Sequence, residues 1–182
     1  SRRDFIRNLG FLAGGSAILA SAPWLASCSP DRLKDLGKEK ARIGLIGTGS
    51  RGMYHVHNLK LIPHAEIAAV CDIYEPNLKQ AADLCPEARQ YRDYRELLED
   101  KDIDGVVIST PLNMHAPITL DALAAGKHVF CEKAMALTLD ECKAVYDAYQ
   151  QTDRALYFCM QRMYDEKYIR GMQLIRDGVI GD

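Results

Sequence analysis

Short apolar runs and longer amphipathic segments alternate along the chain from residue 41 onward. The runs are rich in Val, Ile and Ala and have few polar interruptions, which is typical of strands buried on both faces of a sheet. They predict strands at 42–46, 67–71, 105–109, 128–131 and 156–159. The segments between them predict helices at about 51–61, 76–84, 94–99, 116–125, 139–151 and 165–176. This alternation predicts an α/β fold, a Rossmann-type doubly wound parallel sheet over residues 41–160.

The last part of the chain continues this pattern and then stops. Thr138 and Glu141 form a capping-box sequence before the helix predicted at 139–151, and Gly178 is suited to ending the last helix. Residues 179–182 resemble the start of a further strand. We therefore interpret 161–182 as a linking helix and the beginning of a second domain that is missing from this chain.

The first 28 residues have the pattern of an export signal. Arg2 and Arg3 precede a mildly apolar stretch over 9–26, and the pair resembles a twin-arginine signal. Residues 25–28 resemble a lipobox, in which Cys28 becomes the lipidated first residue; the alternative is an incidental thiol in a plain signal peptide. Residues 29–40 are polar and predict a tether. We expect an exported protein, periplasmic or anchored to the membrane only through Cys28.

Composition narrows the function classes. The 182 residues carry a net charge of −2 and no basic stripe, so nothing favours a nucleic-acid partner. Six cysteines form no C-x-x-C pair, which argues against zinc, and most of them predict buried free thiols. His55 and His57 lie two positions apart and do not share a helix face, so we predict no metal site.

The clearest chemical motif follows the first predicted strand. Its residues are Gly47, Thr48, Gly49, Ser50, Arg51 and Gly52. A G-x-G-x-x-G turn that opens a helix accommodates a dinucleotide pyrophosphate, and Asp72, twenty residues further on, predicts the carboxylate that binds the ribose. Asp72 favours NAD over NADP, although Arg51 could partly offset its repulsion of a 2′-phosphate. The alternative is a glycine turn without a ligand.

Two further clusters follow later strands, at the edge where open parallel sheets bind ligands. The first predicts a lining for the nicotinamide ribose and comprises Ser109, Thr110, Pro111, Asn113 and His115. Its alternative is turn chemistry with a helix N-cap at Asn113 or His115. The second is Glu132 with Lys133, where a lysine beside a carboxylate can hold a substrate hydroxyl or tune proton transfer; its alternative is a surface ion pair.

Together with the run Ala-Gly-Lys-His-Val at 125–129, these motifs resemble the N-terminal domain of the glucose–fructose oxidoreductase, inositol dehydrogenase and MocA (Gfo/Idh/MocA) family over about residues 42–182. The resemblance implies a nicotinamide-binding Rossmann domain followed by a mixed α/β domain with a large open sheet. It implies that Lys133 is catalytic, near the nicotinamide and the reacting hydroxyl, and that Glu132 and Arg162 lie at the cofactor. Ala134 stands where the family has a proline that is often cis, so we expect a rebuilt turn or a differently aimed lysine.

The export signal and the cofactor constrain the reaction together. An exported protein must carry its NAD from the cytoplasm, so we expect a tightly bound nicotinamide and an oxidoreductase acting on a sugar or polyol hydroxyl. The first alternative is an NAD-dependent glycosidase that oxidises its glycoside transiently; residues 137–142 and 161–164 resemble that branch. The second is a non-catalytic NAD-binding sensor or scaffold. We expect a homo-oligomer at full length and no activity from this chain alone.

Overall fold

The computed structural model describes residues 40–160, 165–179 and 181. Contacts divide the chain into Ser1–Ala41 and Arg42–Asp182. The predicted export signal, the tether up to residue 39 and Arg162 lie outside the described residues, so those predictions stay predictions. No described helix has the length and apolar character needed to cross a membrane.

Strands and helices alternate from Ala41 to Cys159. The strands are β1 (Ala41–Ile46), β2 (Ala65–Cys71), β3 (Arg89–Tyr91), β4 (Gly105–Ile108), β5 (His128–Glu132) and β6 (Leu156–Cys159). The helices are α3 (Ser50–Leu59), α4 (Glu75–Leu84), α5 (Tyr94–Glu99), the 3-10 turn η2 (Leu112–Met114), α6 (His115–Ala124), α7 (Leu139–Gln150) and α8 (Glu166–Arg176).

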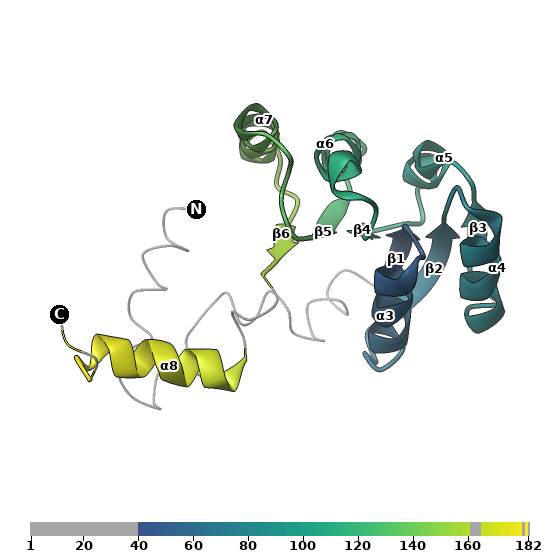
Figure 1. Cartoon of the computed structure of the whole chain (residues 1–182). Helices are drawn as coiled ribbons and strands as arrows, with labels where there is room; N and C mark the ends of the chain where they lie inside the picture. The colour runs from purple at the N-terminus through teal and green to yellow at the C-terminus, as the bar shows by residue number, and fades with distance from the viewer. Residues whose placement is uncertain (1–39, 161–164, 180, 182) are drawn as a thin grey trace. The chain divides into compact units, whose positions relative to one another are not determined.

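The six strands form one sheet in the order β3-β2-β1-β4-β5-β6 (Figure 1). The register pairs Ile46 with Ile108 across β1 and β4, and Ile108 with Cys131 across β4 and β5, all in parallel. This is the doubly wound order of Rossmann folds, in which the chain changes direction across the sheet between β1 and β4. The predicted fold class is confirmed.

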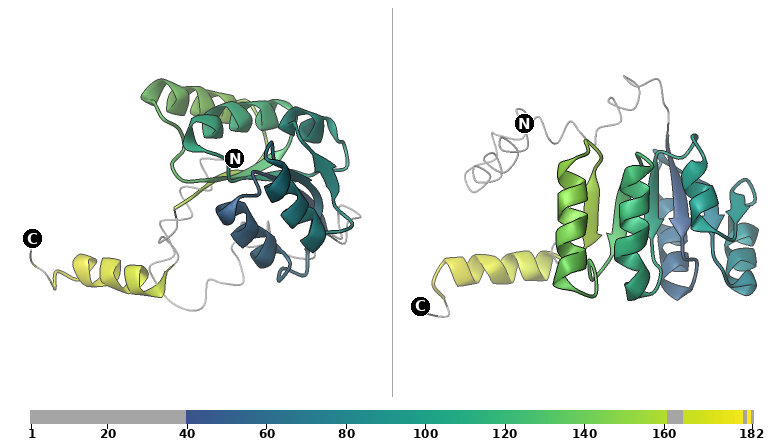
Figure 2. Two further views of the ribbon diagram at one scale, coloured as in Figure 1. Left: turned by 45° about the vertical axis from the view of Figure 1, so that its right-hand side comes forward. Right: turned by 90° about the horizontal axis from the view of Figure 1, so that it is seen from above.

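Helices cover the sheet on two faces (Figure 2). One core lies between the sheet and α5 and α6, with Leu97 and Ile118 among its buried side chains. The other lies between the sheet and α3 and α4, with Val56 and Leu78. The central strands therefore bury both sides, which explains why their sequences read as continuous apolar runs.

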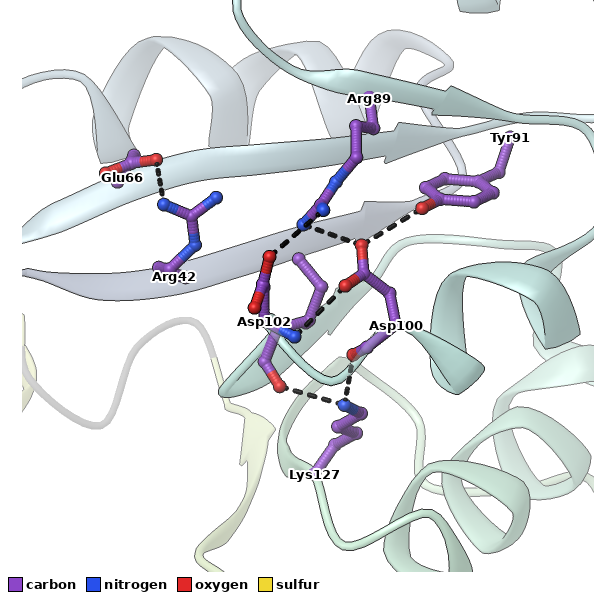
Figure 3. A network of polar contacts seen from close by, with 8 residues as sticks. Arg42, Glu66, Arg89, Tyr91, Asp100, Asp102 and Lys127 are labelled. Atoms are coloured by element: carbon purple, nitrogen blue, oxygen red, sulfur yellow. Dashed lines mark hydrogen bonds and ion pairs between the residues drawn. The ribbon is translucent and has the colours of Figure 1, made fainter.

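A polar junction joins the edge strand β3 to the loop before β4 (Figure 3). The carboxylate of Asp100 accepts hydrogen bonds from Tyr91 at 3.0 Å and forms an ion pair with Arg89 at 2.6 Å. Lys127 is 6% exposed and donates to the carbonyl oxygens of Asp100 and Ile103, at 2.6 and 2.9 Å. Lys127 therefore donates hydrogen bonds to backbone carbonyl oxygens that lie beyond the end of α5. Although it belongs to the run 125–129 that carries the family resemblance, its described contacts stabilise the fold.

Most predicted elements are present with shifted ends. The capping box of Thr138 and Glu141 is confirmed, and Gly178 follows α8 with a φ of +73°. The sequence did not predict β3, which is three residues long. The strand expected at 179–182 is not found at its described residues, because Val179 lies in a turn and Gly181 in no strand.

Candidate dinucleotide-binding site

The turn between β1 and α3 tolerates only glycine at two positions. Gly47 has a φ of +87° and donates its N–H to Cys71 at 2.8 Å. A side chain at Gly47 would lie 2.8 Å from the backbone of Ser109, and a Cβ at Gly52 would lie 2.0 Å from the carbonyl oxygen of Gly47. Both positions therefore need hydrogen in place of Cβ for the strand, the loop and the helix to pack this closely.

The first turn of α3 presents free backbone donors. Gly49 is its N-cap, no side chain caps it, and no acidic residue occupies its first turn. The first helical hydrogen bond runs from Met53 to Gly49, at 2.8 Å. The N–H groups of the three residues between them lack a helical acceptor and carry the positive end of the helix dipole. This is the arrangement that binds phosphate at helix N-termini.

Asp72 follows β2 and is bonded to the glycine loop. Its Oδ2 accepts hydrogen bonds from Thr48 N at 2.7 Å, from Thr48 Oγ1 at 3.3 Å and from Asn77 Nδ2 at 3.4 Å. Its Oδ1 accepts one, from Tyr74 N at 2.9 Å. A carboxylate has about four lone-pair sites, two on each oxygen, so Oδ1 is the oxygen with room for a further donor such as a ribose hydroxyl.

A cavity of about 810 Å³ opens beside this loop. It is lined from the ends of β1, β2 and β4, by residues that include Gly49, Asp72, Ser109, Thr110 and Asn113. Such a cavity lies at the point where the strand order reverses, which is where open α/β sheets bind ligands. The remaining lining residues include Ile73, Tyr94 and Ile118, so one part of the cavity is apolar.

Glu132 joins α3 to the end of β5. Its Oε1 accepts hydrogen bonds from Arg51 Nε at 2.6 Å and from His55 Nε2 at 2.7 Å, and its side chain is 6% exposed. The Arg51 guanidinium also lies over the ring of Tyr54, 4.6 Å from its centre. The contacts of Arg51 are thus with β5, with Cys159 of β6 and with its own helix; none of its described contacts is with Asp72. Nothing here supports the idea that Arg51 offsets the charge of Asp72.

The charges at Glu132 follow from these bonds. Burial favours the neutral acid, but the hydrogen bonds from Arg51 and His55 outweigh it and lower the pKa of Glu132. Burial also lowers the pKa of His55, which favours the neutral ring. The group therefore combines an ionised carboxylate, a charged guanidinium and a neutral imidazole that donates from Nε2.

Lys133 comes next and is exposed. Its side chain has no polar partner among the residues that the structure describes, and its backbone N donates weakly to Glu132 Oε2 at 3.4 Å. The Lys133–Ala134 peptide bond is cis. Lys133 is therefore not in a surface ion pair with Glu132, the alternative that the sequence left open.

His115 is the first residue of α6 and is 2% exposed. Its Nδ1 lies 2.7 Å from the carbonyl oxygen of Ala134 and its Nε2 lies 3.0 Å from that of Thr110. The N-cap of α6 is Met114 and no side chain caps the helix, so the N-cap at Asn113 or His115, which the sequence left open as an alternative, is not formed. The ring instead ties the end of β4 to the segment after β5.

Residues 41–159 match the Gfo/Idh/MocA model, described as an oxidoreductase family with an NAD-binding Rossmann fold. The chain belongs to this family. An inositol 2-dehydrogenase of Salmonella paratyphi B is 36% identical over 143 residues, which cover 77% of this chain and 43% of that protein. An alpha-N-acetylgalactosaminidase of Shewanella oneidensis is 31% identical and covers 100% of this chain and 44% of its own length.

Among solved structures, the scyllo-inositol dehydrogenase of Lactobacillus casei with bound NAD(H) and scyllo-inositol superposes with a TM-score of 0.74 at 29% identity. That match covers 79% of this chain and 43% of the dehydrogenase. The chain thus spans less than half the length of the relatives it matches. The part they share is the NAD-binding Rossmann domain of the Gfo/Idh/MocA family.

The residues at the cavity fit the family's cofactor. The hydroxyl oxygens of Ser109 and Thr110 are buried and have no hydrogen-bond partner among the residues that the structure describes, although both residues line the cavity. Buried polar atoms are rarely left unpaired, so these two hydroxyls indicate a polar ligand. A side chain at Gly49 would meet only the Asn77 amide within 4 Å, which leaves the helix start open to a pyrophosphate. Pro111 and Asn113 are exposed on the same loop.

His55 and Asn77 are two residues of the site that the sequence does not predict there. Both belong to the network around the loop, because His55 bonds the carboxylate before Lys133 and Asn77 bonds that of Asp72. The spacing of His55 from the glycine motif, on the buried face of α3 with Val56 and Met53, was the available signal. Its partner, 77 positions away, was not predictable without the fold.

The described cysteines are free, as predicted for buried thiols. Cys71, Cys85 and Cys131 are buried, whereas Cys142 and Cys159 are half-buried. Burial raises the pKa of Cys71 and Cys131 to about 12, so both remain protonated thiols. Among the residues that the structure describes, no three His, Cys, Asp or Glu side chains cluster as a metal site.

Proposed function

We propose that this chain is the cofactor-binding part of an oxidoreductase that acts on a sugar or polyol hydroxyl and that retains its NAD between turnovers. A bound nicotinamide supplies hydride transfer. The observation that carries the proposal is the convergence of three strand ends: the glycine loop after β1, the unpaired hydroxyls after β4 and Lys133 after β5. His115 bonds the last two segments to each other.

Each segment has a separate task. The N–H groups at the start of α3 bind the pyrophosphate, and Asp72 Oδ1 accepts a hydrogen bond from the adenosine ribose. Ser109 and Thr110 bind the polar groups at the nicotinamide end, which pairs their hydroxyls. Lys133, exposed and without a polar partner among the described residues, binds the reacting hydroxyl of the substrate and assists the movement of its proton. With Asp72 at the adenosine ribose, the site favours NAD over NADP, because the 2′-phosphate of NADP would face a carboxylate.

We further propose that the protein is exported folded, through the twin-arginine signal at its start, and held at the membrane by a lipid on Cys28. Export in the folded state allows a tightly bound cofactor to leave the cytoplasm with the protein. The cofactor must then be restored within each cycle, either by a second sugar or by the same substrate.

A second candidate is a glycosidase that oxidises a sugar, eliminates the leaving group, adds water and reduces the product. The similarity to an alpha-N-acetylgalactosaminidase over the whole chain favours it. In this reaction Lys133 would hold the same hydroxyl, and no net NADH would accumulate.

The test uses the protein at its natural length, purified without added nucleotide. Mass spectrometry of the denatured protein should detect NAD at close to one copy per chain; an empty site that exchanges freely would overturn the retained-cofactor proposal. Inositols, free sugars and aryl N-acetylgalactosaminides are then supplied in parallel. Net NADH indicates a dehydrogenase that releases its electrons, and aglycone release without NADH indicates the glycosidase. Oxidation of one sugar balanced by reduction of another supports the paired reaction.

A further inference from the structure

The segment that carries Lys133 is bonded on both sides by helices from opposite faces of the sheet. Before it, the carboxylate of Glu132 accepts hydrogen bonds from two side chains of α3. After it, the carbonyl oxygen of Ala134 lies 2.7 Å from Nδ1 of His115 on α6. Lys133 thus lies between two residues whose positions are set by different helices.

His115 also bonds the neighbouring segment. Its Nε2 lies 3.0 Å from the carbonyl oxygen of Thr110, in the loop whose two hydroxyls have no partner within the described part of the chain. A carbonyl oxygen only accepts, so each of these bonds forms when the facing ring nitrogen carries a proton: the neutral ring makes one and the imidazolium makes both. The ring is thus the link between the Ser109–Thr110 loop and the Lys133 segment.

The position of His115 argues against a direct part in the chemistry. The residue is 2% exposed, and both ring nitrogens face backbone carbonyls within the protein. A general acid or base needs a nitrogen within hydrogen-bond reach of the substrate. His115 has none to offer while these contacts persist.

We propose that His115 is a positioning residue that fixes the Lys133 segment against the Ser109–Thr110 loop, and so sets where the lysine amine lies relative to the bound nicotinamide. This inference rests on the proposed function, in which Lys133 acts at the reacting hydroxyl. The sequence led us to expect that His115 contacts the cofactor directly. We infer instead that it acts on the cofactor site through its bond to Thr110. Its physical reason is that catalytic groups need supporting bonds to stay within a fraction of an ångström of productive geometry.

The test measures the chemical reactivity of the Lys133 amine. The protein at its natural length, freed of bound nucleotide, is treated with acetic anhydride, with and without saturating NADH, and the peptide containing Lys133 is quantified by mass spectrometry. The variants are His115→Ala and His115→Gln. His57→Ala is the matched control, because His57 is an exposed histidine of α3. The dissociation constant for NADH is measured by fluorescence titration on the same samples.

NADH should slow acetylation of Lys133 in the wild type and in His57→Ala. In His115→Ala the protection, which is the factor by which NADH slows acetylation of Lys133, should fall roughly tenfold. The dissociation constant for NADH should change less than about threefold, because a displaced lysine amine no longer lies beside the nicotinamide although NADH still binds. The His115→Gln variant should be intermediate, because its one amide nitrogen can lie at only one of the two carbonyls, whereas the ring places a nitrogen at each of them.

The outcomes separate the two proposals. No protection of Lys133 in the wild type overturns its role in the proposed function. Protection in the wild type that is unchanged in both His115 variants overturns the positioning role and leaves the proposed function intact. A parallel loss of NADH binding in both variants also overturns it, because His115 would then hold the cofactor loop itself. If His115→Ala does not fold, His115→Gln carries the comparison, and protection equal to the wild type counts against the inference.

Discussion

Asp72 follows β2 and accepts hydrogen bonds from the turn between β1 and α3, whereas Glu132 is the last residue of β5 and accepts hydrogen bonds from α3. Asp72 accepts from backbone and neutral side-chain donors and lines the cavity. Glu132 accepts from a guanidinium and an imidazole and is buried. The same chemical group therefore appears twice at one edge of the sheet in two environments.

The two carboxylates differ in whether an acceptor position remains free for a ligand. Asp72 keeps a free lone-pair direction on an oxygen beside the cavity and can bind a ligand. Glu132 uses its charge to hold α3 against β5; under the proposed function, its effect on the chemistry passes through Lys133. A carboxylate that can bind a ligand and one that stabilises the fold are distinguished here by their donors and burial, not by their position at the end of a strand.

The largest loss of stability is expected from a substitution of Glu132, the buried carboxylate. Glu132→Ala leaves Arg51 and His55 without their acceptor. Breaking a buried charge pair costs about 3–5 kcal/mol, and we expect roughly 3 because the Arg51 side chain is 35% exposed and recovers water. Urea unfolding measures the loss. Glu132→Gln, which keeps the shape and one acceptor, should lose less; equal losses would show that charge is irrelevant there.

At Asp72 we expect a smaller loss of stability and a larger one of ligand binding. Asp72→Ala removes the acceptor for Thr48 N and for the ribose hydroxyl. A hydrogen bond to a charged group contributes about 1.5–3 kcal/mol, so NAD affinity should fall roughly 10- to 100-fold. The preference for NAD over NADP should relax, as measured by titration with both. Glu75→Ala, a neighbouring exposed carboxylate, is the control; a preserved preference in Asp72→Ala would remove Asp72 from cofactor selection.

The free energy of unfolding should depend on pH through the buried group of Glu132 and His55. The pKa of His55 is lowered from 6.5, so its stabilising contribution is present above about 6.5 and is lost as pH falls below it. The pKa of Glu132 is lowered from 4.5, so its contribution is lost further into acid. Each group adds a slope of at most about 1.4 kcal/mol per pH unit. In His55→Gln the first decline, measured by unfolding at pH 7 to 5, should disappear; an unchanged slope would assign it elsewhere.

The smallest effect is expected from Thr48→Val. It removes the 3.3 Å hydroxyl bond to Asp72 but keeps the 2.7 Å backbone bond. A neutral bond of this kind contributes about 0.5–1.5 kcal/mol, and we expect the lower end, seen by thermal unfolding, with NAD affinity nearly unchanged. A large loss of affinity would mean that the Thr48 hydroxyl itself contacts the cofactor.

Much of the fold was readable from the chain. Continuous apolar runs predicted five of the six strands, because strands buried on both faces leave little room for polar residues. β3 was missed since its Arg-Gln-Tyr sequence lies at the sheet edge, where burial imposes no such pattern. The start of α6 was predicted to within one residue, but the N-cap left open at Asn113 or His115 is not formed, because η2 precedes the helix and no side chain caps it.

The sequence by itself determined the glycine turn, the place of Asp72 and the order of the strand ends, because these depend on local backbone requirements and on spacing along the chain. Only the tertiary structure decided which groups meet across the sheet. It paired Glu132 with His55, turned Arg51 toward β5, and enclosed His115 between Thr110 and Ala134. Apart from the contact of His115 with Thr110, those contacts join residues 19 to 81 positions apart, and no local preference of a side chain encodes a partner at that distance.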